Sequence, residues 1–284
     1  MATIFHKVSA LQEQVASYKA EGKKVGFIPT MGALHEGHLS LVRQSVSEND
    51  FSVVSIFVNP TQFNDPKDLL HYPRTIEQDL DLLDTVGETD VFIPDVLEIY
   101  PEGTDKDNNL DLGGLDLSME GASRPGHFMG MAQVVLRLLD IVKPHHLYMG
   151  QKDFQQYTIV NYLIQKYEIP VQLVRCPIVR EPNGLAMSSR NVRLRKEVRN
   201  QASLIYNTLT EVKSHMDNMD VLSLESFAMK RLRATPFEPE YFNIVNGATL
   251  QPIRNMDDTD FAVACTAVRV EGVRLIDNMI LKEE

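Results

Sequence analysis

The first half of the chain alternates short apolar runs with segments of helical periodicity. Residues 23–28 predict a strand, and residues 51–58 predict a second strand whose nearly all-apolar sequence is typical of burial on both faces. Between these strands, Leu39, Val42 and Val46 have helical spacing. The elements predicted after them are a helix at 75–85, strands at 90–93, 146–149 and 171–175, and a helix at 153–167.

The strongest helical pattern lies in the middle of the chain, where Pro144 ends it. Its apolar positions are Met131, Val134, Val135, Leu138, Leu139 and Val142. Residues 94–127, just before it, are rich in Gly, Pro, Asp and Asn. We expect them to form a long loop over an active site, because long structureless segments inside a compact domain are usually functional.

Five strands separated by helices predict an α/β fold with a Rossmann-like parallel sheet and helices on both faces. Such sheets bind ligands where loops leave the carboxyl ends of the strands. After residue 178 the alternation stops, and a long amphipathic helix at 202–216 is followed by predicted strands at 240–245, 261–270 and 273–281. We therefore expect a Rossmann-like, ligand-binding domain over 1–178 and a smaller C-terminal α+β domain over 179–284.

Composition narrows the possible partners. The 284 residues include 28 Lys+Arg and 39 Asp+Glu, a formal net charge of −11 at pH 7. This charge argues against nucleic acid, because affinity for nucleic acid comes largely from surplus positive charge. We expect no membrane span, because no long apolar run occurs. Cys176 and Cys265 have neither metal-ligand spacing nor a disulfide framework, and the N-terminus lacks the apolar core of a secretory signal, so we expect a cytoplasmic protein.

The sequence PTMGALHEGH at 29–38 follows the first predicted strand and leads into a helix. His35 and His38 are one helical turn apart, and Gly32 and Gly37 permit close approach of a ligand. Because a helix N-terminus attracts phosphate, we expect two neutral imidazoles that stabilise charge on a phosphate group. In the alternative, one histidine caps the helix and the other lies at the surface. A metal site is less favoured, because two ligands are too few.

A second candidate segment is VREPNGLAMSSRN at 179–191, after the last predicted strand of the sheet. A turn at 182–184 precedes Ser188, Ser189 and Arg190, so we expect a mobile loop whose hydroxyls and guanidinium suit the outer phosphates of a nucleotide. Taken alone, Ser-Ser-Arg is common on protein surfaces. Its place beyond the last strand of a sheet whose first strand leads into the histidine motif favours phosphate binding.

The third candidate, MGQKDFQQ at 149–156, also follows a predicted strand. Gly150 permits close approach, Lys152 supplies a positive charge for phosphate, and Asp153 can accept hydrogen bonds from ribose hydroxyls. The alternative is an ordinary helix start with Asp153 as its N-cap. That alternative explains neither Gly150 nor Lys152.

Neutral amides and acids follow the second predicted strand. In FVNPTQF at 57–63, Asn59 and Gln62 can hold a hydroxyl or a carboxylate without titrating, although a proline-containing turn explains the segment equally well. The segment YPRTIEQDL at 72–80 and the residue after it hold Arg74, Glu77, Asp79 and Asp81, which can place Mg²⁺ near phosphates. Acids at such positions are more often the solvated first turn of a helix.

An HxGH sequence after the first strand and a Ser/Arg loop after the last resemble the nucleotidyl-transferase superfamily. The fuller set of motifs resembles one family much more narrowly, the pantoate–β-alanine ligases (pantothenate synthetases). These motifs cover most of 25–195 in the expected order, and they are PTMGALHEGH, SIFVNPTQF, YPRT, RPGHF, GQKDFQQ and GLAMSSRN.

The resemblance implies an ATP-dependent ligation in pantothenate and coenzyme A biosynthesis. The carboxylate of (R)-pantoate attacks the α-phosphorus of ATP, giving pantoyl adenylate and pyrophosphate. The amine of β-alanine then attacks the activated carbonyl and releases AMP. Both nucleophiles are substrates, so the protein supplies alignment and charge stabilisation. The resemblance also implies Mg²⁺, a homodimer, binding of ATP and pantoate by 1–178 and a lid role for 179–284.

The resemblance further assigns site residues. The catalytic residues are His38 as the family's catalytic acid, His35, Lys152, Ser188, Ser189 and Arg190. The ATP-binding residues are Met31, Gly32, Ala33, Leu34, His35, Glu36, Gly37, His38, Gly150, Gln151, Lys152, Asp153, Val179, Met187, Ser188, Ser189 and Arg190. The substrate-binding residues are Met31, Asn59, Gln62 and Gln156, and the metal ligand is Asp79.

Two other classes of function remain open from the sequence. A nucleotidyltransferase would move AMP or CMP onto a phosphate-bearing acceptor without forming an amide. A nucleotide sensor would bind ATP without turnover. A tRNA synthetase is disfavoured, because the chain lacks a basic region for tRNA.

Overall fold

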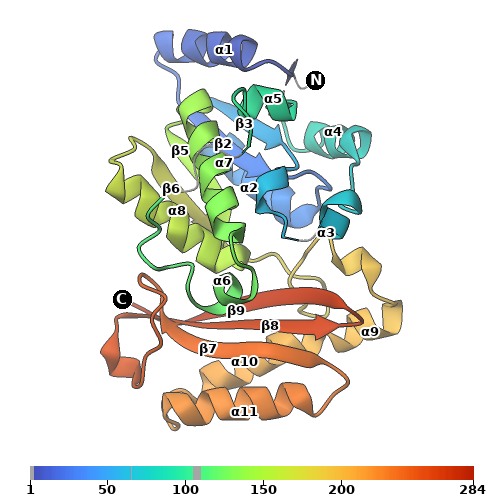
Figure 1. Ribbon diagram of the computed structural model, residues 1–284, viewed down its shortest axis with the longest axis vertical. Coiled ribbons are helices and arrows are strands. Elements are labelled where there is room, and N and C mark those ends of the chain that lie inside the picture. The colour runs from blue at the N-terminus through green and yellow to red at the C-terminus, as the bar shows by residue number, and fades with distance from the viewer. Residues whose placement is uncertain (1–2, 65, 105–109) are drawn as a thin grey trace. The chain divides into compact units, whose positions relative to one another are not determined.

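The computed structural model describes residues 3–64, 66–104 and 110–284 (Figure 1). The chain forms two compact units. The first comprises Met1–Asp116, Gly121–Gly150 and Ile159–Cys176, and the second comprises Leu117–Glu120, Gln151–Thr158 and Pro177–Glu284. A single boundary at residue 178 therefore did not anticipate the two short segments, 117–120 and 151–158, that belong to the second unit.

The first unit is built on a parallel sheet of six strands in the order β1-β4-β3-β2-β5-β6. The strands are β1 (Thr3–Phe5), β2 (Val25–Thr30), β3 (Phe51–Ile56), β4 (Asp90–Phe92), β5 (His146–Gly150) and β6 (Gln172–Cys176). All five predicted strands are present, and the parallel α/β sheet is confirmed. The sequence did not predict β1, because three residues are too short to show a period.

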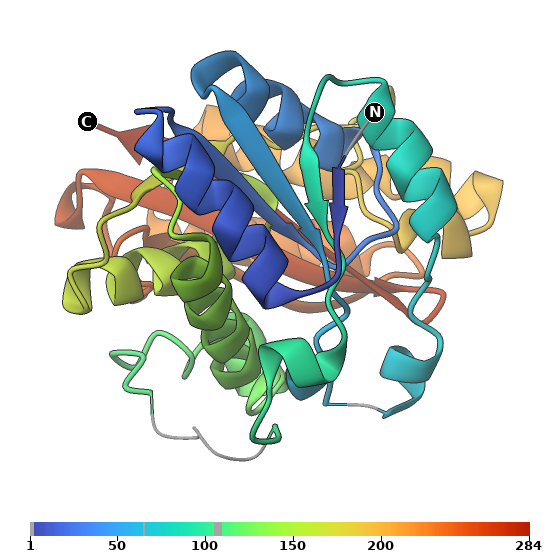
Figure 2. The ribbon, with the colours of Figure 1, turned by 90° about the horizontal axis from the view of Figure 1, so that it is seen from above.

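Helices cover both faces of this sheet, with α1 and α7 on one face and α2 and α4 on the other (Figure 2). The helices of this unit are α1 (Val8–Ala20), α2 (Glu36–Glu48), α3 (Pro66–Leu70), α4 (Ile76–Asp84), α5 (Val96–Ile99) and α7 (His127–Val142). On the α2 side, Leu39 and Val42 pack with Val54 of β3 and Leu83 of α4 in one buried cluster. The predicted helical spacing at Leu39 and Val42 thus marks the buried face of α2.

Residues 94–127 differ from the single long loop that the composition predicts. They contain α5 and α6 (Met119–Ser123), and α7 begins within them at His127. Residues 105–109 of the expected loop lie outside the described residues. Helix α8 (Phe154–Lys166) follows a short 3₁₀ helix, Gln151–Asp153, and includes residues of both units.

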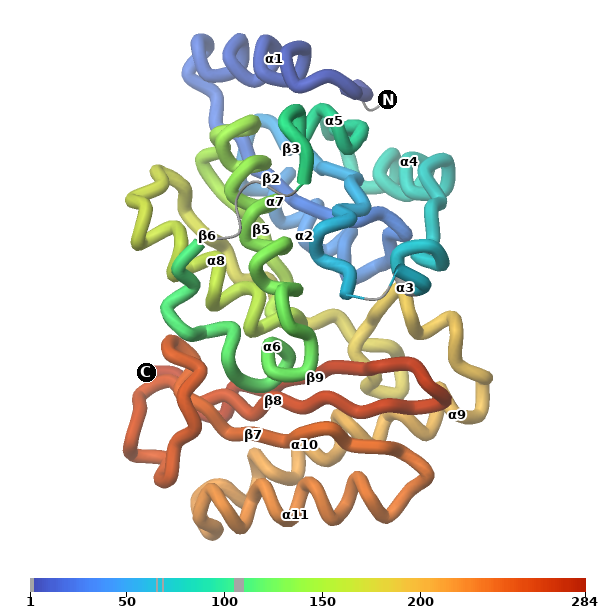
Figure 3. Tube along the Cα trace, viewed as in Figure 1, coloured from blue at the N-terminus to red at the C-terminus, as the bar shows by residue number. Residues whose placement is uncertain are grey.

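The second unit is built on an antiparallel sheet in the order β7-β8-β9, with β7 at Glu238–Asn246, β8 at Phe261–Val270 and β9 at Val273–Glu283. Strands β8 and β9 form a long hairpin (Figure 3). The hairpin closes through Glu271 and Gly272, whose φ angles of 49° and 75° suit the two-residue turn that matches the strand twist. The expected smaller α+β fold of the C-terminal region is confirmed.

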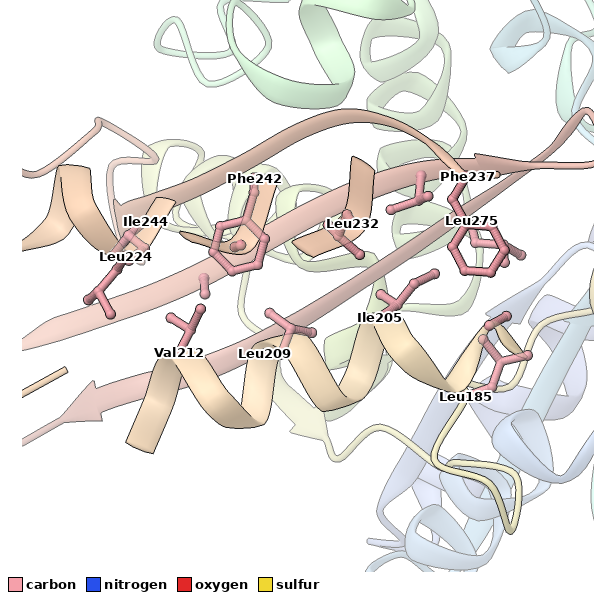
Figure 4. Packing of buried hydrophobic residues seen from close by; sticks show 14 of the residues in the cluster. Leu185, Ile205, Leu209, Val212, Leu224, Leu232, Phe237, Phe242, Ile244 and Leu275 are labelled. Atoms are coloured by element: carbon pink, nitrogen blue, oxygen red, sulfur yellow. The ribbon is translucent and has the colours of Figure 1, made fainter. Parts of the chain in front are cut away.

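Helices pack on one face of this smaller sheet (Figure 4). They are α10 (Ser203–His215) and α11 (Val221–Arg233), and α9 (Lys196–Gln201) leads into α10. Ile205, Leu209 and Val212 of α10 pack with Leu224 of α11 and Phe242 of β7. Helix α10 was predicted and α11 was missed, although its buried residues have helical spacing.

No helix in the described part of the chain combines the length and the apolar character that a membrane crossing requires.

A buried carboxylate on β4 gives a test of the first unit. Asp90 is buried and accepts a hydrogen bond from the Tyr18 hydroxyl of α1 at 2.9 Å. Burial raises the pKa of Asp90, against the opposing hydrogen bonds from Tyr18 and Thr3. The folded protein therefore holds a proton on this group more tightly than the unfolded chain does, and its stability falls as pH rises through the raised pKa.

We expect Asp90→Asn to raise the unfolding temperature at pH 7, because the amide removes the buried charge and still accepts from Tyr18. The gain should vanish at acidic pH, where the wild-type carboxyl is protonated. Thermal unfolding across pH measures both effects, with the exposed Asp81→Asn as the matched control. A lower unfolding temperature for Asp90→Asn at pH 7 would contradict this interpretation.

Candidate active site

The chain between β2 and α2 makes an unusual turn. Gly32 has a φ of 77° and Ala33 a φ of 50°, so two consecutive residues adopt the left-handed conformation. For alanine this conformation is unfavourable, because its Cβ approaches the backbone. A Cβ on Gly32 would lie 3.0 Å from the Asp79 Oδ2 atom. Glycine is therefore needed at Gly32, and Ala33 requires support from its surroundings.

Asp79 supplies that support. Its side chain is buried, with the residue 1% exposed. Oδ2 accepts from the Ala33 backbone N–H at 3.0 Å, and Oδ1 accepts from the Leu34 backbone N–H at 2.8 Å and from the Thr75 hydroxyl at 3.2 Å. Both carboxylate oxygens are thus engaged by the protein, which favours a structural role for Asp79, and the Mg²⁺ ligand assignment stays a prediction. Among residues 3–64, 66–104 and 110–284, no three His, Cys, Asp or Glu side chains form a cluster that could hold a metal ion.

The turn places the two histidines at the N-terminus of α2. His35 is the N-cap, with Nδ1 accepting from the Gly37 backbone N–H at 3.1 Å, and His38 Nδ1 accepts from the His35 backbone N–H at 3.3 Å. An accepting Nδ1 belongs to a neutral ring whose proton is on Nε2, so these hydrogen bonds assign both tautomers. The ring centroids lie 4.1 Å apart. Both residues are half-buried, and His38 completes the capping box rather than lying free at the surface.

A second polar group lies beyond β3, the neighbour of β2 in the sheet. Gln62 is buried at the end of a 3₁₀ helix, Pro60–Gln62, and its Nε2 donates to the Met31 sulfur at 3.0 Å. Asn59 Nδ2 donates to the Gln62 Oε1 at 3.1 Å and to the Gly130 carbonyl at 3.0 Å. The expected substrate-binding residues Met31 and Gln62 are therefore in contact.

Asn59 has a different role from the one expected. It is buried, and its Oδ1 accepts from the Tyr100 hydroxyl at 2.8 Å and from the Thr61 hydroxyl at 3.0 Å. Since its amide nitrogen and oxygen both bond to protein atoms, Asn59 holds Gln62 in place instead of binding substrate directly. This corrects its assignment as a substrate-binding residue.

The start of α7 holds the same segment from the other side. His127 is buried, and its Nδ1 lies 2.8 Å from the Gln62 carbonyl while its Nε2 lies 3.0 Å from Arg124 Nη1. The carbonyl can only accept, so Nδ1 carries the proton and Nε2 accepts from Arg124. A Cβ on Gly130 would lie 2.2 Å from the Thr61 carbonyl oxygen, so α7 can pack here only with glycine at this position.

The segment after β5 belongs to the second unit. Residues Gln151–Asp153 form one 3₁₀ turn before α8. The Lys152 side chain is only 20% exposed, and its Nζ lies 3.7 Å from Asp153 Oδ2. Gln156, assigned to pantoate, is half-buried in the first turn of α8.

The segment at 179–191, which we expect to be a mobile loop, contains a hydrogen-bonded turn. The Glu181 N–H donates to the Leu185 carbonyl at 2.8 Å, and the Met187 N–H donates to the Val179 carbonyl at 3.0 Å. Ser188 Oγ accepts from the Arg190 N–H at 3.2 Å. The ATP-binding assignments Val179 and Met187 therefore lie on two paired stretches of the same turn.

Polar side chains that sequence reasoning missed hold this turn in shape. Glu181 accepts from Arg199 through both oxygens, with Nη2 to Oε1 at 2.7 Å and Nε to Oε2 at 2.8 Å. Asn191 is buried and donates to Glu181 Oε1 at 2.7 Å and to the Ala186 carbonyl at 3.0 Å. Glu181 is an acid among the basic residues of this segment, a pattern that could have predicted an ion pair.

Comparison with known proteins identifies the family. The family model for pantoate-beta-alanine ligase matches residues 3–280. The pantothenate synthetase of Bacteroides fragilis (strain ATCC 25285) is 47% identical over 281 residues, which is 99% of each chain. That of Porphyromonas gingivalis (strain W83) is 46% identical over 277 residues, 97% of this chain and 98% of that one. The chain belongs to the pantoate–β-alanine ligase family.

Solved structures of the family have the same fold. The pantothenate synthetase of Thermus thermophilus is 39% identical with a TM-score of 0.91, and 99% of each chain is covered. The pantoate-beta-alanine ligase of Francisella tularensis, solved in complex with beta-gamma ATP and beta-alanine, is 35% identical with a TM-score of 0.79 and covers 99% of this chain and 98% of that one. The family membership that the motifs predicted is thereby confirmed.

The role of Asp79 can be tested by substitution. We expect Asp79→Asn to lower the free energy of unfolding by about 1–3 kcal/mol, because an amide has one acceptor where two backbone N–H groups need two. Released from its support, the turn at Ala33 should also misplace His35 and His38 and lower kcat/KM. Chemical denaturation and steady-state kinetics measure the two effects.

A matched control is Glu77→Gln, an exposed acid in the same turn of α4. A metal ligand at Asp79 would behave differently. Unchanged stability together with a raised Mg²⁺ requirement would contradict the structural role.

Proposed function

We propose that this chain condenses pantoate with β-alanine in an ATP-dependent reaction, with pantoyl adenylate as the intermediate. The proposal is supported by family membership over nearly the whole chain and by a relative solved in complex with beta-gamma ATP and beta-alanine. The observation that carries it is the pair of neutral imidazoles at the N-terminus of α2, His35 and His38.

In the first step the pantoate carboxylate oxygen bonds to the α-phosphorus, and the bond to the bridging oxygen breaks to release pyrophosphate. With the proton on Nε2, His35 and His38 can each donate a hydrogen bond to phosphate oxygens as charge shifts between them. Donors fixed in advance stabilise such charge without reorganising during the reaction. Because the attack is made by a carboxylate, it needs no proton delivered to a neutral group, and His38 acts as a hydrogen-bond donor rather than a literal acid.

We assign the triphosphate also to residues of the second unit. Lys152 supplies a positive charge, and Arg190 can bind phosphate oxygens with two N–H groups. Ser188 and Ser189 add hydroxyl donors, and Val179 lies on the stretch assigned to adenine. These groups neutralise the charge that moves to pyrophosphate.

We assign pantoate to Gln62 and Gln156, with Met31 beside Gln62. An amide that Asn59 holds by its oxygen presents its N–H group in a fixed direction. In the second step the β-alanine amine bonds to the carbonyl carbon of the adenylate, and the bond to the phosphate oxygen breaks to release AMP. Fixed donors beside the carboxyl group orient it for both attacks.

Mg²⁺ and a homodimer stay predictions from the resemblance. The described residues offer no carboxylate or imidazole cluster for a protein-held metal, so the donors that fit Mg²⁺ best here are the ATP phosphates themselves. Bound there, Mg²⁺ would neutralise phosphate charge. We also infer that the second unit serves as the lid of the site.

The reaction is tested by product analysis. We expect pantothenate and AMP to form in equal amounts, and both products to require pantoate, β-alanine and ATP together. AMP formation that does not respond to the omission of β-alanine would favour a nucleotidyltransferase. ATP binding without any turnover would favour a nucleotide sensor.

Two substitutions test the charge-stabilising groups. We expect His38→Ala and Lys152→Ala each to lower the adenylation rate about 10²-fold or more, because each removes a fixed donor to a charge that develops in the transition state. Pantoate-dependent exchange of pyrophosphate into ATP measures this rate. Lys196→Ala, at an exposed lysine of α9, serves as the control. A near-wild-type exchange rate in both variants would contradict the assignment of His38 and Lys152 to the active site.

The pantoate assignment predicts a separate effect. We expect Gln62→Ala to raise the KM for pantoate chiefly, and Asn59→Ala to raise it in the same direction because Asn59 fixes the Gln62 amide. Steady-state kinetics with each substrate varied in turn measure this, with Ser47→Ala, at an exposed position of α2, as the control. An unchanged KM for pantoate in Gln62→Ala would contradict the assignment.

A further inference from the structure

Two adjacent polar residues interrupt the apolar sequence of β9. Asp277 and Asn278 are 4% and 2% exposed, and their neighbours along the strand are apolar. Burying an acid and an amide is costly unless each is fully hydrogen-bonded. Successive side chains of a strand point to opposite faces, so these two reach different parts of the second unit.

Asn278 binds the turn that carries Lys152. Its Nδ2 donates to the Gln151 carbonyl at 3.0 Å and to the Lys152 carbonyl at 2.9 Å, and its Oδ1 accepts from Gln151 Nε2 at 3.1 Å. One side-chain amide thus makes three hydrogen bonds to two consecutive residues. The backbone position of Lys152 is set by this amide.

Asp277 binds the turn that leads to Ser188–Arg190. Its Oδ2 accepts from Arg180 Nη1 at 2.6 Å and its Oδ1 accepts from Arg180 Nη2 at 3.0 Å, a two-pronged ion pair. Arg180 Nη1 also donates to the Gly184 carbonyl at 3.1 Å, and the guanidinium stacks 4.0 Å from the centroid of the Tyr206 ring. The guanidinium therefore spans the turn from its start to its tip.

The two contacts are coupled through the strand itself. The Asn278 backbone N–H donates to Asp277 Oδ1 at 2.8 Å. Burial raises the pKa of Asp277, and the Arg180 guanidinium and the more distant Lys152 charge oppose that rise. The carboxylate is therefore stabilised chiefly by Arg180 of the 179–191 turn.

We propose that Asp277 and Asn278 are positioning residues that hold the Lys152 turn and the 179–191 turn in a fixed arrangement for ATP. We assign neither residue to the reacting atoms, because the hydrogen bonds of both side chains go to protein atoms. Each fixes the backbone of a segment that the proposed function assigns to the nucleotide, and the proposal rests on that assignment. Misplacing a binding group by about 1 Å is enough to cost up to 10²-fold.

The test uses the full chain and measures two quantities, the Kd for a non-hydrolysable ATP analogue and the KM of each substrate. We expect Asn278→Ala to raise the Kd of the analogue and the KM for ATP tenfold or more, and to leave the KM for β-alanine within twofold. Arg180→Lys keeps the cation and loses the two-pronged geometry, so it should raise both ATP constants by a smaller factor.

Thr266→Val is the matched control. Thr266 is buried, lies opposite Asp277 on β8 and donates only to the Tyr241 carbonyl, at 2.8 Å. The Thr266→Val substitution removes a buried hydrogen bond from the same sheet and removes none of the hydrogen bonds that Asp277 and Asn278 make to the two turns. We expect it to lower stability and to leave the ATP constants unchanged.

The outcomes are distinct. If Asn278→Ala folds and lowers only kcat, with the Kd and the KM for ATP within twofold of wild type, the two residues are merely structural and the proposal is overturned. If Asn278→Ala does not fold, the same comparison is made with Arg180→Lys. A Kd of the analogue and a KM for ATP within twofold of wild type in that variant would then overturn the proposal. Wild-type protein that binds the analogue but makes no pantothenate would overturn the proposed function, while the Kd values would still decide the positioning role.

Discussion

The candidate site depends on one carboxylate that meets two backbone N–H groups. Asp79 holds Ala33 and Leu34 in a turn that alanine does not adopt by itself. The turn decides where α2 begins, and the start of α2 decides which atoms of His35 and His38 are occupied. Because each Nδ1 accepts a backbone N–H, each ring is neutral with its proton on Nε2. Asp79, more than forty residues after this turn in the sequence, thus helps to fix the position and the tautomer of His35 and His38.

Elsewhere in the protein too, the residues that we assign to ligands differ from the residues that hold them in position. Lys152 and Arg190, which we assign to ligands, are half-buried, whereas Asn278 and Asn191, which hold their segments, are buried and hydrogen-bonded within the protein. Asn59 fixes Gln62, and Glu181 with Asn191 fixes the turn before Arg190. Removing one partner from such a pair leaves the other buried without a hydrogen bond, which costs more than the bond is worth. In our proposal, this arrangement keeps the groups that we assign to ligands in place before ATP binds.

Much of the fold could be predicted from local patterns. The alternation of apolar runs and helical spacing predicts five strands of the parallel sheet, and the motifs predict the family. The short strand β1 was not predicted, because three residues show no hydrophobic period. It forms by pairing with β4. Helix α11 was not predicted either, although the helical spacing of its buried residues is visible in the sequence. These residues are Val221, Leu224, Ala228 and Leu232.

The site was less predictable, because the function of a polar residue depends on where its side chain points. In the sequence, Asp79 is an acid in a helical first turn, and nothing local shows that it faces inward to the β2–α2 turn. Asn59 is likewise an amide beside a proline until its contacts with Gln62 and Gly130 are known. Asp277 and Asn278 carry a sequence signal, an acid and an amide inside an apolar strand, but their partners lie about a hundred residues or more away and come only from the fold.

The central claim is that the pantoate carboxylate attacks the α-phosphorus of ATP at this site. The most direct measurement uses pantoate labelled with ¹⁸O in its carboxylate and follows the label by mass spectrometry of the products. The account predicts that each AMP carries one ¹⁸O, because the carboxylate oxygen that bonds to phosphorus leaves with AMP when β-alanine forms the amide. Unlabelled AMP, or label in inorganic phosphate or pyrophosphate, would contradict it.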